Sequence, residues 1–308
     1  MGREGEAADS VRELRKGHPD YPERLGHLAS APDPVFLAGP WDHPGPFVTI
    51  VGTRDASPDG CDVARDLARA LAERGVAILS GLARGIDAAA HEGALAADGV
   101  SGAVLGTPLD VTYPREHAFL QSRLRRSLGL MSEIESGGPT TPNMFAARNR
   151  MLAALADAVV VVQGRAGSGA LLTAREAHRL GRPLGAIPWD SRDPLAFAPH
   201  DLIRDGRATL VATADDVMKL LGRETEGPLP ARPRRARGIL PRASLETLPP
   251  RERALYRALR ERPLPLDHLA GTAGLTASEL TIALLALELS GLARRLPGGF
   301  ARLTRRAP

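Results

Sequence analysis

The 308-residue chain contains one cysteine, Cys61, and almost no lysine. A single cysteine cannot form an intrachain disulfide, and chains without disulfides are typical of the reducing cytoplasm. The sequence also lacks any run of about 18 apolar residues, the length that a transmembrane helix needs. Its polar N-terminus, MGREGEAADSVRELRKGHPD, has no apolar stretch of the kind that a secretory signal carries. We therefore expect a cytoplasmic protein that does not enter a membrane.

The common signatures of metal binding and catalysis are missing as well. The eight histidines show no pairing at the spacing of metal ligands, and one cysteine is too few for a zinc cluster. Gly164, Gly167 and Gly169 have the wrong spacing for a G-x-G-x-x-G fingerprint, and no G-K-[ST] or G-x-S-x-G motif occurs. Asp87 and His91 lie on one predicted helix, where we interpret Asp87 as a cap or turn residue and His91 as a packing residue. We predict no catalytic residue, no metal and no cofactor, and therefore no enzymatic activity.

Positive charge is concentrated at one end of the chain. From Arg223 onward there are 16 arginines and no lysine against 8 acidic residues, whereas residues 1–222 carry 24 basic and 28 acidic residues. An arginine-rich genome explains the preference for arginine over lysine, but it does not explain this asymmetry. The charge distribution by itself points to an anionic partner for the C-terminal part.

Composition divides the chain into four regions. Residues 1–45 form a proline-rich N-terminal lead-in segment, for which we predict at most one or two short helices. Residues 46–221 alternate apolar runs with helical patterns. Residues 222–247 combine several prolines with many arginines and no apolar periodicity, which is typical of a linker. Residues 248–308 return to helical periodicity and form a separate small domain.

The alternation in residues 46–221 predicts an α/β fold. Short apolar runs predict strands at 47–52, 76–81, 101–106, 128–134, 158–164 and 183–188. Helical patterns follow at 61–75, 86–97, 143–156, 168–181 and 212–222. Strands that alternate with helices of this length indicate βαβ units around a parallel sheet. The predicted fold is an extended Rossmann-like, doubly wound, mostly parallel sheet.

Glycine and polar residues gather at four predicted strand ends. The segments are VGTRDAS (51–57), SGLARGID (80–87), LGTPLDVTYP (105–114) and QGRAGSGALLTA (163–174). In an open parallel sheet these ends meet in one crevice, where helix N-termini and backbone amides bind anions. Tight turns need glycine, and this need alone explains one such segment. Three of the four segments also carry an arginine, however: Arg54, Arg84 and Arg165. Together they predict a phosphate-binding crevice.

Two further arginines support that prediction. Arg148 and Arg150 stand near the beginning of the helix predicted at 143–156, where a cation opposes the helix dipole. An unfavourable position beside a predicted anion site favours a functional interpretation over surface solubility.

The last region has the pattern of a winged helix. A helix over LPPRERALYRALRERP precedes a short helix, a glycine turn and a third helix, for which Thr276 and Glu279 form a capping box. A short hairpin with Gly298 and Gly299 at its turn completes a small C-terminal winged-helix-like domain. Because the third helix carries two acids and no base, we expect partner binding or weak electrostatic contact rather than duplex recognition.

Taken in order, the motifs VGTR, SGLARGIDAAAHEGAL, AVLGTPLDVTYP, FAARNRMLAAL and SGALLTA resemble the DprA/Smf family of DNA-processing proteins over residues 21–221. The resemblance implies sequence-independent binding of single-stranded DNA by the Rossmann-like domain and a homodimer formed through that domain. It also implies loading of the RecA recombinase onto incoming DNA in natural transformation, with no chemistry on the strand. Carried over by position, the DNA- and phosphate-binding residues are Gly52, Thr53, Arg54, Ser80, Gly81, Arg84, Gly85, Arg148, Asn149, Arg150, Ser168, Gly169 and Thr173.

The sequence departs from the family pattern at two strand ends. Gln163 stands where the family usually has an acidic residue, and Pro188 and Trp189 stand where Pro-Gly is common. Loss of an acid should not weaken anion binding, and Trp189 offers either a stacking surface for a base or simple packing. Two alternatives stay open: a nucleotide-binding sensor, and a nucleotide phosphoribohydrolase of the related Rossmann-like families. The PGGxGTxxE signature of the latter is not matched by GRAGSGALLTARE.

Overall fold

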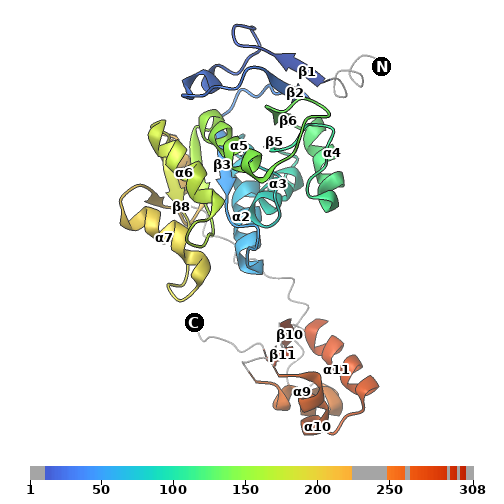
Figure 1. Cartoon of the computed structure of the whole chain (residues 1–308). Coiled ribbons are helices and arrows are strands. Elements are labelled where there is room, and N and C mark those ends of the chain that lie inside the picture. Colours follow the sequence, from blue (N-terminus) through green and yellow to red (C-terminus); the bar gives the residue numbers. More distant parts are fainter. Residues whose placement is uncertain (1–10, 224–247, 261–263, 290–291, 297–298, 303–308) are drawn as a thin grey trace. The chain divides into compact units, whose positions relative to one another are not determined.

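The computed structural model describes residues 11–223, 248–260, 264–289, 292–296 and 299–302 (Figure 1). The chain divides into two compact units, Met1–Glu226 and Gly227–Pro308. All but the first two residues of the predicted linker, 222–247, lie outside the described residues.

The first unit is built on a nine-stranded sheet in the order β1-β2-β6-β5-β4-β3-β7-β8-β9. The strands are β1 (Val11–Leu14), β2 (Val35–Ala38), β3 (Phe47–Val51), β4 (Ala77–Ser80), β5 (Ser101–Val104), β6 (Gly129–Ser132), β7 (Ala158–Val161), β8 (Leu184–Ala186) and β9 (Thr209–Leu210). The seven strands from β6 to β9 in this order are parallel, whereas β2 and β1 are added antiparallel at one edge. The predicted doubly wound, mostly parallel sheet is confirmed.

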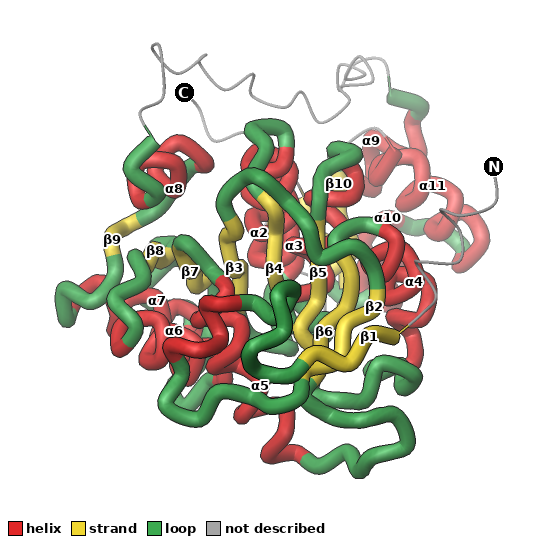
Figure 2. Tube along the Cα trace, turned by 90° about the horizontal axis from the view of Figure 1, so that it is seen from above, coloured by secondary structure: helices red, strands yellow, loops and turns green. Residues whose placement is uncertain are grey.

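Helices cover both faces of the sheet (Figure 2). One face carries α2 (Pro58–Ala72), α3 (Ile86–Ala96), α4 (Ala118–Arg126) and α8 (Ala214–Leu220). The other carries α5 (Pro142–Leu155), α6 (Gly169–Arg179) and α7 (Phe197–Arg204). Three short 3-10 helices complete the unit: η1 (Glu23–His27), η2 (Arg115–His117) and η3 (Pro194–Ala196). The chain moves outward from β3 to β6 and then returns to the other side of β3 for β7, so β3 and β7 flank the topological switch point.

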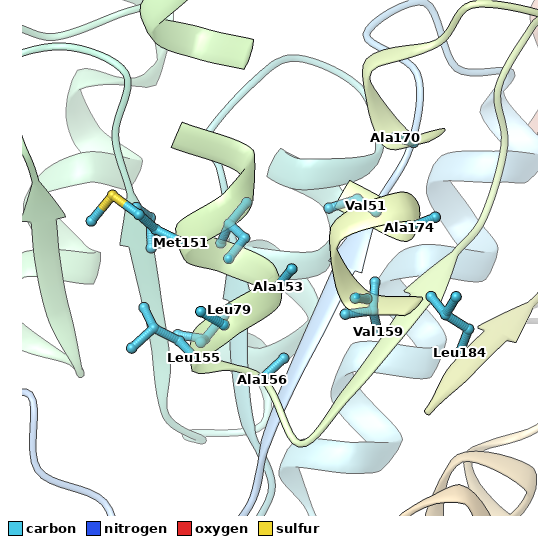
Figure 3. Packing of buried hydrophobic residues seen from close by; sticks show 14 of the residues in the cluster. Val51, Leu79, Met151, Ala153, Leu155, Ala156, Val159, Ala170, Ala174 and Leu184 are labelled. Carbon is cyan, nitrogen blue, oxygen red and sulfur yellow. The ribbon is translucent and has the colours of Figure 1, made fainter. Parts of the chain in front are cut away.

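Strand β7 shows why this sequence folds into three layers. Val159 and Val161 pack against α5 and α6, while Val160 packs toward α2 on the opposite face, and all three are fully buried. A strand covered on both faces needs an unbroken apolar run, which the sequence provides here. Figure 3 shows the core under α5, where Met151 and Leu155 approach the sheet.

The structure corrects the secondary structure expected in the lead-in segment. Residues 1–45 were predicted to hold only short helices, yet β1 and β2 lie there and extend the sheet beyond β6. Both strands have four residues, and β2 stands between Pro34 and Pro40, so neither shows a long enough pattern to be recognised. Helices α4 and α7 and strand β9 were also missed, because each is short and has few apolar residues facing inward.

Among its described residues, the second unit contains three helices and a hairpin, as expected for a winged-helix-like domain. Its elements are α9 (Pro250–Ala258), α10 (Leu266–Ala273), α11 (Ala277–Leu289), β10 (Ala293–Leu296) and β11 (Gly299–Arg302). The predicted capping box is confirmed: Glu279 Oε2 accepts hydrogen bonds from the backbone N and Oγ1 of Thr276 at 3.0 and 2.8 Å. Leu255, Leu269 and Leu284 meet in its core.

Within the described residues, no single helix is long and apolar enough to cross a membrane. Helices α10 and α11 reach the required length and composition only as a pair, and that pair is bent by 101°.

We expect Leu79→Ala to destabilise the first unit. The Leu79 side chain is fully buried in β4, and its removal leaves a cavity under α5 that costs about 2–5 kcal/mol. Urea unfolding, monitored by circular dichroism, measures the change in the free energy of unfolding. Leu210→Ala, at a position that is 50% exposed in β9, is the matched control and should change the free energy of unfolding by less than about 0.5 kcal/mol. Equal losses for the two variants would contradict this description of the core.

Candidate nucleic-acid interface

A pocket of about 410 Å³ opens at the topological switch point. Its walls come from the segment after β3, the segment after β4, the β7–α6 connection and one side of α5. The first three are carboxyl ends of neighbouring strands, where open α/β sheets bind ligands. The predicted crevice therefore exists as a cavity, formed by three of the four glycine-rich strand ends and by α5.

The predicted site residues divide into two groups. Eight of them line the pocket: Gly52, Thr53, Arg54, Arg148, Asn149, Ser168, Gly169 and Thr173. Five others do not line it: Ser80, Gly81, Arg84, Gly85 and Arg150. The contacts of both groups with a ligand stay predictions. Their positions nevertheless show which of them a ligand in this cavity can reach.

Arg54 and Phe145 form the outer rim of the pocket. Arg54 is exposed in the loop after β3, and its guanidinium carbon lies 5.4 Å from the centroid of the Phe145 ring. The same ring lies 5.1 Å from that of Tyr113. Phe145 was not among the predicted residues. Its position three residues before Arg148, one helical turn away on the same face, was the signal in the sequence that could have identified it.

Arg148 forms the floor of the pocket rather than its rim. Its guanidinium is buried, and Nη1 donates to the carbonyl oxygen of Val104 at the end of β5. The space is provided by Gly81, where an added Cβ would lie 1.7 Å from Nη1. Desolvation lowers the pKa of Arg148 to about 10, against the attraction of the Asp87 carboxylate. The side chain therefore stays charged at neutral pH, in a position with little water.

Asp87 is the counter-charge for this buried cation. Its Oδ2 accepts hydrogen bonds from the backbone N–H groups of Gly81 and Ala83 at 3.1 and 3.3 Å. Burial raises the pKa of the Asp87 carboxyl above its ordinary value by desolvation. The charge of Arg148 and these hydrogen bonds oppose the shift. Asp87 lies in the first turn of α3, whose N-cap is Gly85, so of its two interpretations as a cap or a turn residue the structure supports the turn residue.

The structure corrects the dipole argument for Arg148 and Arg150. Helix α5 begins at Pro142, so both arginines lie beyond its first turn and do not oppose the dipole there. Arg150 instead forms a bidentate ion pair with Glu133, with N–O distances of 2.9 and 2.6 Å. Arg84 is similarly held by Glu116. Two of the predicted phosphate-binding cations thus have carboxylate partners within the protein.

Ser80 and Gly85 shape the loops next to the pocket. Ser80 is buried, and its Oγ donates to the carbonyl oxygen of Ile50 at 2.6 Å, which joins β4 to β3. Gly85 has φ +72°, and an added Cβ there would lie 2.5 Å from the carbonyl oxygen of Thr53. A side chain at position 85 would push the loop that carries Arg54 out of place.

The N-terminus of α6 faces the pocket from the opposite side. Ser168 is its N-cap, and Asn149 Nδ2 donates to the carbonyl oxygen of Gly169 at 3.2 Å, which ties α5 to this turn. Arg165 is exposed just before it. Neither Arg54 nor Arg165 has an ion-pair partner among the residues that the structure describes. Two exposed cations and a helix N-terminus thus surround one cavity, an arrangement that attracts anions.

Gln163 fixes the loop after β3, which carries Arg54, through hydrogen bonds. Its side chain is fully buried; Oε1 accepts from the backbone N of Ser57 at 3.1 Å and Nε2 donates to Ser57 Oγ at 2.9 Å. Its carbonyl oxygen accepts from the N–H of Thr53 at 2.8 Å.

The Trp189 indole N–H donates to the carbonyl oxygen of Val162, and the ring packs against the core beside α2. Of the two interpretations of Trp189, the structure favours packing.

His91 lies in the core of the sheet layer, outside the pocket. Because Ser101 Oγ already donates to the carbonyl oxygen of Ile78, it accepts a hydrogen bond from His91 Nδ1 at 2.8 Å, and Nε2 has no partner. Desolvation, with the nearby charges of Arg148 and His117, lowers the pKa of His91 to about 3. The described residues contain no group of His, Cys, Asp and Glu that suits a metal ion.

Comparison with protein families gives two matches. The family described as DNA recombination-mediator protein A matches residues 13–222, and the DprA winged helix domain matches residues 240–299. Among curated proteins, a putative DNA processing protein DprA of Mycobacterium tuberculosis is 39% identical over 247 residues, which cover 79% of this chain and 61% of that protein. Protein Smf of Escherichia coli is 37% identical over 287 residues, 92% of this chain and 75% of its own length.

Solved structures of two DNA processing proteins resemble this chain. DNA processing protein A of Streptococcus pneumoniae has a TM-score of 0.65 and 34% identity, covering 70% of this chain and 76% of that one. The protein of the same name from Helicobacter pylori, described with a single-stranded DNA binding mode, has a TM-score of 0.62 and 27% identity, covering 69% and 95%. The chain spans about three fifths of the length of the mycobacterial relatives.

The buried, neutral state of His91 predicts a loss of stability in mild acid. Its pKa of about 3 in the folded protein is below the ordinary value of 6.5, so below about pH 6.5 the unfolded chain binds a proton that the folded protein does not. The free energy of unfolding should therefore fall by up to about 1.4 kcal/mol per pH unit on the acid side of about pH 6.5.

Urea unfolding between about pH 7 and about pH 5.5 tests this prediction, because most carboxylates stay ionised in that range. His91→Gln should flatten the slope, whereas replacement of the exposed His178 by Gln should leave it unchanged. An identical slope in all three proteins would mean that another group is responsible.

Proposed function

Because this chain belongs to the DprA/Smf family of DNA-processing proteins, we propose that it binds single-stranded DNA, without sequence preference, in the crevice at the switch point. The observation that carries the proposal is that Arg54 and Arg165, two exposed arginines without an ion-pair partner among the described residues, surround one cavity together with the N-terminus of α6. The single-stranded DNA binding mode described for the Helicobacter pylori relative supports the same ligand.

The lining of the crevice suits a phosphodiester strand. Guanidinium groups, backbone amides and hydroxyls bind phosphate oxygens, and those contacts do not distinguish one base from another. The half-buried Phe145 ring, which faces Arg54, provides a surface on which any base can stack. Sequence-independent binding follows from these two kinds of contact.

The buried guanidinium of Arg148 supports this site from below. Arg148 is only 3% exposed and its charge is balanced by Asp87, so its role is to hold α5 against β5. Arg84 and Arg150 are likewise paired with carboxylates, so the exposed Arg54 and Arg165 contribute most to the attraction of an anion.

We propose further that the bound strand is handed to the RecA recombinase, without chemistry on the DNA, during natural transformation or recombination. The description of the matching family as a recombination mediator supports this role. Asp87 and His91, the titratable pair singled out in the sequence, are both buried and hydrogen-bonded within the fold, which fits a binding site better than a catalytic one. Filament assembly of RecA on strands coated with single-strand-binding protein is the direct test, and no acceleration would refute it.

A homodimer formed through the Rossmann-like unit stays a prediction, which multi-angle light scattering of the full chain tests.

The acidic third helix of the C-terminal domain suits a protein partner better than duplex DNA. Gel shifts with single- and double-stranded DNA, with and without residues 223–308, separate the contributions of the two units.

A nucleotide-binding role for the same cavity is the second candidate. A pocket of about 410 Å³ lies within the size range of small-molecule sites. Thr173, which lines it, is buried, and its Oγ1 has no hydrogen-bond partner among the described residues. Thermal-shift measurements with nucleoside monophosphates test this candidate, and release of free base from them would indicate the hydrolase alternative.

We expect Arg54→Gln to weaken binding of oligo-dT by about 10- to 100-fold, because one charge-assisted contact is lost while the fold is kept. Fluorescence anisotropy at several salt concentrations measures the effect. The slope of log affinity against log salt should decrease by about 0.7 for each phosphate contact removed.

Arg126→Gln is the matched control for this variant. Arg126 is exposed at the C-terminal end of α4, just before β6 begins. It therefore lies at the amino ends of the parallel strands, whereas the crevice lies at their carboxyl ends. Its replacement should leave both the affinity and the salt slope nearly unchanged. Equal losses for the two variants would refute the assignment of the crevice as the binding site.

A further inference from the structure

The fourth glycine-rich strand end, LGTPLDVTYP (105–114), is the one of the four whose residues line no part of the pocket. It follows β5 and lies next to the segment after β4, because β4 and β5 are neighbours in the sheet. It nevertheless reaches the rim of the pocket, where the ring centroids of Tyr113 and Phe145 are 5.1 Å apart. This strand end therefore stands beside the proposed binding site without a role in it.

Internal contacts fix the segment between β5 and α4. Ser132 Oγ donates to the carbonyl oxygen of Thr107 at 2.8 Å, near the beginning of the segment. At its other end, His117 Nδ1 donates to a carbonyl oxygen of the segment after β4 at 2.9 Å. The side chain of Leu109 is buried in the core beside α4. Because the segment is held at both ends and in between, the position of Tyr113 is fixed as well.

Two aromatic rings from different connections meet at this rim. Tyr113 is 49% exposed, in a chain with only three tyrosines and six phenylalanines. The two rings are tilted by 52°, so neither ring fully covers a face of the other. Phe145 is also held by Gly106, where an added Cβ would lie 2.9 Å from Cδ1 of the ring. The pair thus offers a rigid aromatic surface that extends from the pocket toward β5.

Cations accompany both rings. The guanidinium carbon of Arg54 lies 5.4 Å from the centroid of the Phe145 ring. Arg84 pairs with Glu116, three residues beyond Tyr113, and the two side chains are 64% and 51% exposed. An ion pair so open to water contributes little stability, and Glu116 engages only Nε of a group that has five N–H donors. The remaining donors of Arg84 are therefore available to a phosphate.

We propose that Tyr113 is a second stacking surface for the bound single strand. One base stacks on Phe145 at the pocket, and the neighbouring base stacks on Tyr113. The proposal rests on the proposed function and extends it, because it assigns the strand a path from the switch point across β4 toward β5. Stacking on an aromatic ring accepts any base, so this subsite keeps binding independent of sequence.

A length series of unlabelled oligo-dT, from the dinucleotide to the dodecanucleotide, tests the subsite in competition with a labelled strand, with the full chain and fluorescence anisotropy. Tyr113→Ala should weaken long strands by about tenfold through the loss of one stacked base, and leave the shortest strands, which occupy the pocket alone, unaffected. The slope of log affinity against log salt should stay unchanged, because no phosphate contact is removed. In that respect the variant should differ from Arg54→Gln.

Two conservative variants separate stacking from support of the Phe145 ring. Tyr113→Phe should bind like the unaltered protein, because it keeps the aromatic face. Tyr113→Leu keeps an apolar contact with Phe145 but cannot stack, so it should lose long-strand affinity as Tyr113→Ala does. An equal loss at every length would mean that Tyr113 only positions Phe145, and it would overturn the subsite.

Phe119→Ala is the matched control, because Phe119 is 74% exposed on α4 and does not line the pocket. It should behave like the unaltered protein at every length. Unchanged affinity of Tyr113→Ala for long strands would overturn the subsite alone. If the unaltered protein bound no strand of any length, the proposed function would fail and the subsite with it.

Discussion

The burial of Arg148 constrains the whole crevice, because a charge that leaves water needs partners that replace its hydration. Val104 accepts from its guanidinium, and Asp87 provides the counter-charge. The Asp87 carboxylate in turn fixes the backbone of Gly81 and Ala83 at the end of β4. One ionic cluster therefore joins α3, α5, β4 and β5 at the edge of the sheet where the pocket opens.

Around this cluster the arginines perform different tasks. Those tied to carboxylates, such as Arg84 and Arg150, brace one loop or helix against another. Arg54 and Arg165 have no such partner among the described residues and stand at the pocket, together with the N-terminus of α6. A sheet edge built in this way has a rigid interior and a rim of available cations, which suits a ligand with regularly spaced charges.

Prediction from the sequence succeeded where burial leaves a simple pattern. Strand β7 and helix α2 were found because a strand covered on both faces must be apolar throughout and a surface helix must be apolar on one side. Strands β1 and β2 were missed, because runs of four residues resemble loops until β2 pairs with β6 and β1 pairs with β2. The glycine motifs located the crevice, but they did not reveal Phe145, whose importance depends on its contact with Arg54.

The sequence by itself determined the doubly wound sheet, the winged-helix-like unit, the family and the strand ends at which a ligand site must lie. Periodicity, glycine placement and ordered motifs are local properties, and the sequence shows them directly. Only the tertiary structure decided which arginine is buried, which is paired and which faces the pocket. Arg148 and Arg150 stand two residues apart, yet one forms the pocket floor and the other binds Glu133. That difference arises from the elements that pack around each side chain.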